Sequence, residues 1–193
     1  MPRRAEQARA VEKRQAILSA ASEIMLSEGL NNVTHRQVAA KAGVPVGSIG
    51  YYYDSREKLL QTCLELVDET RSKLFAEVST RVTPETSVEQ LAEWIVHATT
   101  LGGKTSLASL VAVAIDALRE TGELPNLVRG HCRNHKDEIE SLLAIANIDR
   151  KAAELIYEDV VGVAVHDALK SERKSDVATD AVISTLQKFD KRP

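Results

Sequence analysis

The sequence predicts an all-α protein. Of its 193 residues, 44% are hydrophobic and only 4% are aromatic, a composition that suits a compact, mostly helical chain with one substantial core. After residue 58, apolar residues recur at helical spacing in long segments. Proline, glycine and capping residues separate these segments. We therefore take the elements in order as helices.

A short helix begins after Thr34. The hydroxyl of Thr34 can accept a hydrogen bond from the first helical turn, whose backbone N–H groups lack partners within the helix. Val38, Ala39 and Ala42 then give this helix a small apolar face. Gly43 is expected to end it, because glycine readily adopts the positive φ that closes a helix.

A second short helix is expected from Val46 to about Tyr52. Pro45 precedes it and has a fixed φ suited to a helix start. Ile49 is its only plainly inward aliphatic residue, so most of its side chains should face outward. The major groove of DNA admits an α-helix, and hydroxyl side chains can bond to base edges there. The two helices are therefore typical of a unit that reads DNA.

These helices carry a specific set of residues. The set is Thr34, Val38-Ala39, Ala42-Gly43-Val44, Gly47, Tyr51-Tyr52-Tyr53 and Arg56, preceded by Ala16-Ile17-Leu18, Ala20-Ala21, Ile24-Met25 and Gly29-Leu30. Over residues 11–60 it closely resembles the DNA-binding region of the tetracycline-repressor (TetR) family of bacterial transcription regulators. The resemblance implies a helix-turn-helix domain at 1–55 and a helical effector-binding and dimerisation domain at 56–193.

Three residues depart from the family pattern. Pro45 replaces the usual serine cap, Gly50 a usual tyrosine and Tyr53 the usual phenylalanine. Gly50 removes one side chain from the helix expected to read DNA, and it costs about 1 kcal/mol of helix propensity relative to alanine.

The resemblance and the outward-facing positions together give the expected DNA contacts. Thr34 and Arg36 should place the first helix on phosphate, and Arg56 and Lys58 should hold the DNA backbone. The expected set is Thr34, Arg36, Pro45, Val46, Gly47, Ser48, Tyr51, Tyr52, Arg56 and Lys58.

Charge is distributed unevenly along the chain. Residues 1–58 hold nine Lys and Arg against six Asp and Glu, whereas the remainder holds 16 against 22. Basic residues at the N-terminus could contact phosphates or a neighbouring minor groove, or could form a solvated tail. They are Arg3, Arg4, Arg9, Lys13 and Arg14.

Six further helices are expected beyond these. One should run from about Arg56 to Val82, and the next should follow a capping box formed by Ser87 and Gln90. The others are expected over 107–118, from Pro125 towards Asn147, and after a cap at Asp149, with a last helix from Asp176 to Phe189.

The last two helices have wide apolar faces. In the family that the chain resembles, such helices from two protomers form a four-helix dimer interface; alternatively, they pack within one protomer. A dimer implies a palindromic operator with half-sites on the order of 34–36 Å apart. The expected interface residues are Ile156, Val160, Val161, Gly162, Ala164, Val165, Leu169, Val182 and Leu186.

The resemblance also implies a pocket for a small effector among the middle helices. Few charges lie on the inward faces, so a largely apolar effector is expected. Each candidate residue could equally be ordinary core. The candidates are Cys63, Val67, Thr70, Trp94, His97, Ser109, His131 and Tyr157.

Other classes of function find less support. His131 and His135 share a helix face, but no second cluster supplies further zinc ligands, so neither a metal nor a cofactor is expected. No nucleotide-binding or hydrolase motif is present, which disfavours an enzyme. A non-specific architectural DNA-binding protein would need basic charge over more of its surface.

No apolar run reaches the roughly 18 residues of a membrane span, and no secretory signal is seen, so a bacterial cytoplasmic location is expected. Repressor and activator are not distinguished.

Overall fold

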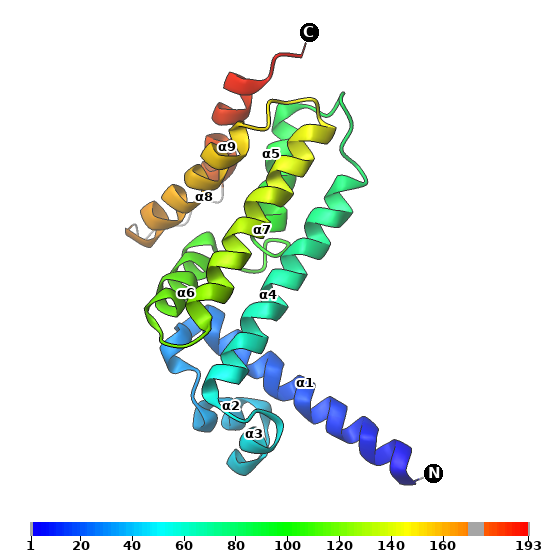
Figure 1. The fold of residues 1–193 in the computed structure, drawn as a ribbon, viewed down its shortest axis with the longest axis vertical. Helices are drawn as coiled ribbons and strands as arrows, with labels where there is room; N and C mark the ends of the chain where they lie inside the picture. Colours follow the sequence, from blue (N-terminus) through cyan, green and yellow to red (C-terminus); the bar gives the residue numbers. More distant parts are fainter. Residues whose placement is uncertain (1, 170–175, 193) are drawn as a thin grey trace. The chain divides into compact units, whose positions relative to one another are not determined.

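The computed structural model describes residues 2–169 and 176–192, and their regular secondary structure is entirely helical (Figure 1). The all-α prediction is confirmed. The elements are α1 (Pro2–Glu28), the short 3-10 helix η1 (Leu30–Asn32), α2 (His35–Ala42), α3 (Val46–Tyr52), α4 (Arg56–Ser79), α5 (Val88–Thr99), α6 (Leu107–Arg119), α7 (Leu124–Ile145), α8 (Ala152–Leu169) and α9 (Asp176–Phe189).

The chain divides into two compact units. The first contains the chain up to Leu66 together with Ala112–Val128, and the second contains Val67–Val111 together with the chain from Arg129. This division differs from the expected boundary between residues 55 and 56. Each change of unit falls inside a helix, namely α4, α6 and α7.

In the first unit, the two short helices have the predicted caps. The Thr34 hydroxyl accepts a hydrogen bond from the backbone N–H of Gln37 at 3.3 Å. Gly43 has a φ of 65° and ends α2, and the N–H of Val44 then donates to the carbonyl of Ala39 at 3.0 Å. These are local interactions, so α2 and α3 are set by residues adjacent in sequence.

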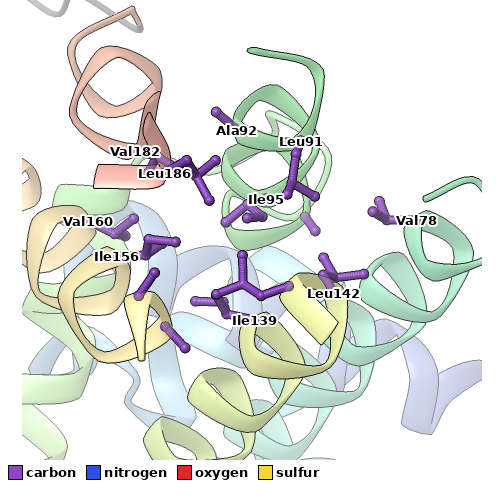
Figure 2. Packing of buried hydrophobic residues seen from close by; sticks show 14 of the residues in the cluster. Val78, Leu91, Ala92, Ile95, Ile139, Leu142, Ile156, Val160, Val182 and Leu186 are labelled. Carbon is purple, nitrogen blue, oxygen red and sulfur yellow. The ribbon is translucent and has the colours of Figure 1, made fainter. Parts of the chain in front are cut away.

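In the second unit, α4, α5, α7, α8 and α9 surround one hydrophobic core. Figure 2 shows side chains from these helices pointing toward one another. The Ser87 hydroxyl caps α5 by accepting from the N–H of Gln90 at 3.2 Å, as predicted. Helix α9 packs against both α8 and α5. The labelled core residues are Val78, Leu91, Ala92, Ile95, Ile139, Leu142, Ile156, Val160, Val182 and Leu186.

Some element limits differ from the predictions. Helix α4 ends at Ser79, and backbone bonds from Arg81 and Val82 to the carbonyl of Val78 continue it as a turn. Asp149 accepts a bond from the N–H of Lys151 in the turn before α8, which starts at Ala152. At the other end, α1 reaches back to Pro2, so basic residues 9, 13 and 14 lie on a helix. The side chains of Arg3 and Arg4 lie outside the described part.

Candidate nucleic-acid interface

Helix α3 buries one face and exposes the other. Ile49 is fully buried, whereas Tyr51 is 82% exposed and Val46 is 52% exposed. At about 100° per residue, Gly47 and Tyr51 lie roughly opposite Ile49. A Cβ added at Gly47 or Gly50 would meet nothing within 4 Å. The outer face therefore carries the side chains of Tyr51 and Val46, with bare backbone at Gly47 and Gly50.

The three consecutive tyrosines occupy different environments. The rings of Tyr51 and Tyr52 meet edge to face with centroids 5.0 Å apart, and Tyr52 is half-buried. Tyr53 is 2% exposed, and the guanidinium of Arg14 lies 5.8 Å from the centre of its ring. Burial raises the pKa of Tyr53, and Arg14 partly offsets the rise. Tyr53 is therefore a core residue, whereas Tyr51 is available to a partner.

Most other expected DNA contacts are exposed. Ser48 is half-buried. The exposed residues are Thr34, Arg36, Pro45, Gly47 and Lys58.

Arg56 has partners within the protein. Its Nε donates to the carbonyl of Val33 and its Nη2 to the carbonyl of Leu30, both at 3.0 Å. Its Nη1 forms an ion pair with Glu120 Oε1, also at 3.0 Å. The guanidinium thus has three partners within the protein, and its expected contact with phosphate stays a prediction.

The expected effector residues do not form one group. Cys63 lies in the first unit, and the other seven lie in the second. Burial raises the pKa of the Cys63 thiol to about 11. His97 is exposed, and the other residues in the second unit are partly buried. Those residues are Val67, Thr70, Trp94, Ser109, His131 and Tyr157.

A charged network joins α4 and α7 in the second unit. Arg71 forms ion pairs with Asp68 and, at 2.9 Å, with Glu138. The hydroxyl of Ser72 donates to the other oxygen of Glu138 at 2.5 Å. His131 Nε2 lies 3.6 Å from Asp68. Two carboxylates thus share one arginine in a largely buried setting.

His135 is buried beside this network. It packs between the rings of Phe75 and Tyr157, and its Nε2 lies 3.0 Å from the Thr99 hydroxyl. That hydroxyl donates its hydrogen to the carbonyl of Ile95 at 2.8 Å, so Nε2 must be the donor to Thr99. Burial, and then the charge of Arg71, lower the pKa of His135 to about 3. His135 is therefore a neutral imidazole.

His131 and His135, which share a face of α7, have different partners, Asp68 and Thr99. Within residues 2–169 and 176–192, no group of three or more His, Cys, Asp or Glu residues is arranged to hold a metal ion.

The expected dimer residues fall into two groups. Ile156, Val160, Ala164, Val182 and Leu186 are buried in the protomer's own core. These five residues therefore pack within the protomer, which corrects the expectation that one protomer leaves their helix faces uncovered. Val161 is half-buried, and Gly162, Val165 and Leu169 are exposed, with Val165 at 46% and Leu169 at 81%.

Comparison with known proteins agrees with this geometry. Residues 17–63 match the family model described as bacterial regulatory proteins, tetR family. The HTH-type transcriptional regulator SrpR of Pseudomonas putida is 37% identical over 57 residues, which are 30% of this chain and 27% of SrpR. The matched part of the chain thus spans about a quarter of the length of that relative. The family-model match covers η1, α2 and α3 with parts of α1 and α4.

Residues 17–63 therefore carry a domain of the tetR family. Solved structures show that the fold is shared over nearly the whole length. A TetR-family transcriptional regulator from Agrobacterium tumefaciens is 16% identical with a TM-score of 0.77, covering 93% of this chain and 98% of that one. The multidrug binding protein EbrR, in complex with imidazole, is 22% identical with a TM-score of 0.63, covering 90% and 94%.

Sequence reasoning missed two features of this chain. The first is the set of protein partners of Arg56, which are distant in sequence. The second is the polar network, which did leave a signal. On α7, His131, Asn134, His135 and Glu138 recur at the spacing of one helix face.

None of the described helices is both long and apolar enough to cross a membrane.

Proposed function

We propose that this TetR-family transcription regulator is a repressor that binds a palindromic operator as a homodimer and is released by a small, largely apolar effector. The observation that carries the proposal is the exposed face of α3, where Tyr51 and Val46 project beside Gly47 and Gly50. Such a helix fits the major groove, and an aromatic or hydroxyl group there can contact base edges or a thymine methyl group. The site of action would be the bacterial cytoplasm.

Dimerisation is proposed because α3 is only seven residues long. A single short helix makes few base contacts, and two-fold symmetry doubles them. The exposed apolar residues Val165 and Leu169 on α8 support a partner at this face.

Effector release is proposed for the second unit. Its core combines apolar helices with a neutral, hydrogen-bonded His135 and the aromatic rings around it, a mixture typical of small-molecule sites. The fold is shared with EbrR, a multidrug binding protein whose structures contain imidazole and ethidium. An effector that binds better to the form with weak DNA affinity must lower operator affinity by the same factor that operator lowers effector affinity.

The test is titration of the purified protein against DNA from upstream of its own gene, with excess random competitor, at two salt concentrations. We expect binding that resists the competitor. Tyr51→Ala should lower the preference for operator over random DNA by about tenfold, equivalent to ~1.4 kcal/mol. Tyr52→Ala should lower it less, because Tyr52 is half-buried. If neither variant changes this ratio, α3 does not read the bases.

A further inference from the structure

We infer that Arg56 positions the helix-turn-helix from inside the protein, and that Arg56 and Glu57 together hold the turn between α6 and α7 to the start of α4. The inference rests on the proposed function, because the reading helices are what this arrangement would position. Arg56 would then affect DNA binding without contacting phosphate.

The first part of the arrangement fixes the segment that leads into α2. Leu30 starts η1, and Val33 immediately precedes the cap residue Thr34. Arg56 binds the carbonyls of both Leu30 and Val33 at 3.0 Å. Since α4 begins at Arg56, the first turn of α4 holds the start of the helix-turn-helix directly.

The second part reaches the turn after α6. Arg56 Nη1 pairs with Glu120 Oε1 at 3.0 Å, with side-chain exposures of 35% and 27%. A partly exposed ion pair of this kind contributes little to stability by charge alone. The pair matters for geometry, because the planar guanidinium of Arg56 can hold three acceptors in fixed directions, whereas a lysine ammonium is a point charge.

Glu57 holds the other end of the same turn. Its Oε1 accepts a hydrogen bond from the N–H of Glu123 at 3.0 Å, just before α7 begins at Leu124. A carboxylate is favourable at a helix N-terminus. Gly122 has a φ of 80°, and a Cβ there would lie 2.2 Å from Glu57 Oε1. The missing side chain of Gly122 therefore admits the carboxylate.

The expected effect on DNA binding follows from which residues share a compact unit. Residues 112–128 belong to the same compact unit as α2 and α3. Loss of the Arg56 bonds would release the carbonyls before α2 and one side of the turn. The reading helices would then be held less firmly, which lowers operator affinity without changing the number of phosphates neutralised.

The experiment compares four single variants: Arg56→Met, Arg56→Lys, Glu120→Gln and Lys58→Gln. Operator affinity is measured across a salt series below the unfolding temperature of each variant. A residue that contacts phosphate contributes about 0.9 to the slope of log affinity against log salt. Lys58→Gln is the matched control, because Lys58 is exposed and lies two residues from Arg56.

We expect Arg56→Met to lower operator affinity by about tenfold, ~1.4 kcal/mol, with the salt slope unchanged. Arg56→Lys should not restore affinity, because lysine keeps the charge but loses the fork. Glu120→Gln should weaken binding, and the double variant with Arg56→Met should lose less than the sum of the two. Lys58→Gln should lower the slope. The inference is overturned if Arg56→Met lowers the slope as well, or if Glu120→Gln strengthens binding.

A second measurement needs no DNA, so it separates the inference from the proposed function. Amide hydrogen exchange in Arg56→Met should accelerate at residues 33–38 and 119–124 and stay unchanged in α5. Unchanged exchange in the first two segments would overturn the inference. If Arg56→Met shows this exchange pattern but the wild-type protein shows no preference for the operator, only the proposed function is overturned.

Discussion

At the residue scale, Gly122 occupies a position that a side chain cannot enter without displacing its neighbour. An added Cβ would lie 2.2 Å from Glu57 Oε1 and 2.9 Å from Glu57 Cδ, and the backbone has a φ of 80°. We expect Gly122→Ala to lower the free energy of unfolding by about 1–2 kcal/mol for the positive φ alone. Displacement of the Glu57 carboxylate should add to this loss. Urea denaturation measures the change.

The matched control is Gly103→Ala. Gly103 has nearly the same φ, 75°, but a Cβ there would meet nothing within 4 Å. The difference between the two variants therefore reports the Glu57 contact. Combining Glu57→Ala with Gly122→Ala should reduce the additional effect of Gly122→Ala to the cost of the positive φ. Equal losses for Gly122→Ala and Gly103→Ala would contradict this account.

His135 gives a second prediction at this scale. Its pKa is about 3 in the folded protein, against an ordinary value of 6.5 in the unfolded chain. Below pH 6.5 the His135 imidazole binds a proton in the unfolded state but not in the folded state, so the free energy of unfolding falls as pH falls from about 6.5 towards 3. Between pH 6.5 and 5 one such group accounts for up to about 2 kcal/mol.

The test compares wild type with His135→Gln, which keeps an N–H donor near Thr99. Urea denaturation at pH 7 and pH 5 should show a larger loss of stability in the wild type. The other histidines are common to both proteins, so the difference belongs to His135. The same loss in both proteins would show that His135 is protonated in the folded state.

At the scale of elements, α3 is short and contains two glycines, Gly47 and Gly50. A glycine within a helix is less stable than alanine by roughly 0.5–1 kcal/mol. A methyl group at Gly50 meets open space, so Gly50→Ala should stabilise the free protein by about that amount. The same methyl group would separate the backbone of α3 from DNA, so operator affinity should fall.

Gly130→Ala in α7 provides the comparison. Gly130 is also helical with open space around its Cβ position. It should show the same gain in urea denaturation and no change in operator affinity. If Gly50→Ala also leaves operator affinity unchanged, the backbone of α3 does not approach the DNA closely.

The elements also show what the sequence can predict. The caps at Thr34 and Ser87 and the end of α2 at Gly43 depend on residues a few positions away, and all three are confirmed. Glu120 is 64 residues from Arg56, and Thr99 is 36 residues from His135; helical periodicity carries no information about such pairs. Periodicity also cannot distinguish a helix face covered within the protomer from one that a partner covers, hence the corrections to the expected dimer residues.

At the scale of the whole molecule, the proposed dimer depends on the apolar residues that α8 still exposes. They are Leu155, Val165 and Leu169, at 41%, 46% and 81%. Exposed apolar residues that lie together mark interaction surfaces. We expect Val165→Glu to give a folded monomer, because a charge at an apolar interface loses its water without gaining a partner.

Sedimentation equilibrium measures the oligomeric state, and circular dichroism confirms folding. Ile115→Glu is the control, since Ile115 is 40% exposed on α6. It should leave the dimer intact. A dimeric Val165→Glu protein would place the interface elsewhere. Substitutions of the buried residues of α8 would not distinguish loss of the dimer interface from loss of folding, because they would also disturb the core.

The division of the chain into units has a consequence for how the protein is made. The ribosome releases a chain from its N-terminus, so α2 and α3 emerge well before residues 112–128, which complete their unit. Until Glu123 has emerged, the first 66 residues lack one or both of Glu120 and Glu123, which bind Arg56 and Glu57 in the finished protein. We therefore expect the first unit to reach its final packing only after residues 112–128 have been made. A nascent chain stalled before that point would contain all of α2 and α3 but would lack residues that bind Arg56 and Glu57 in the finished protein.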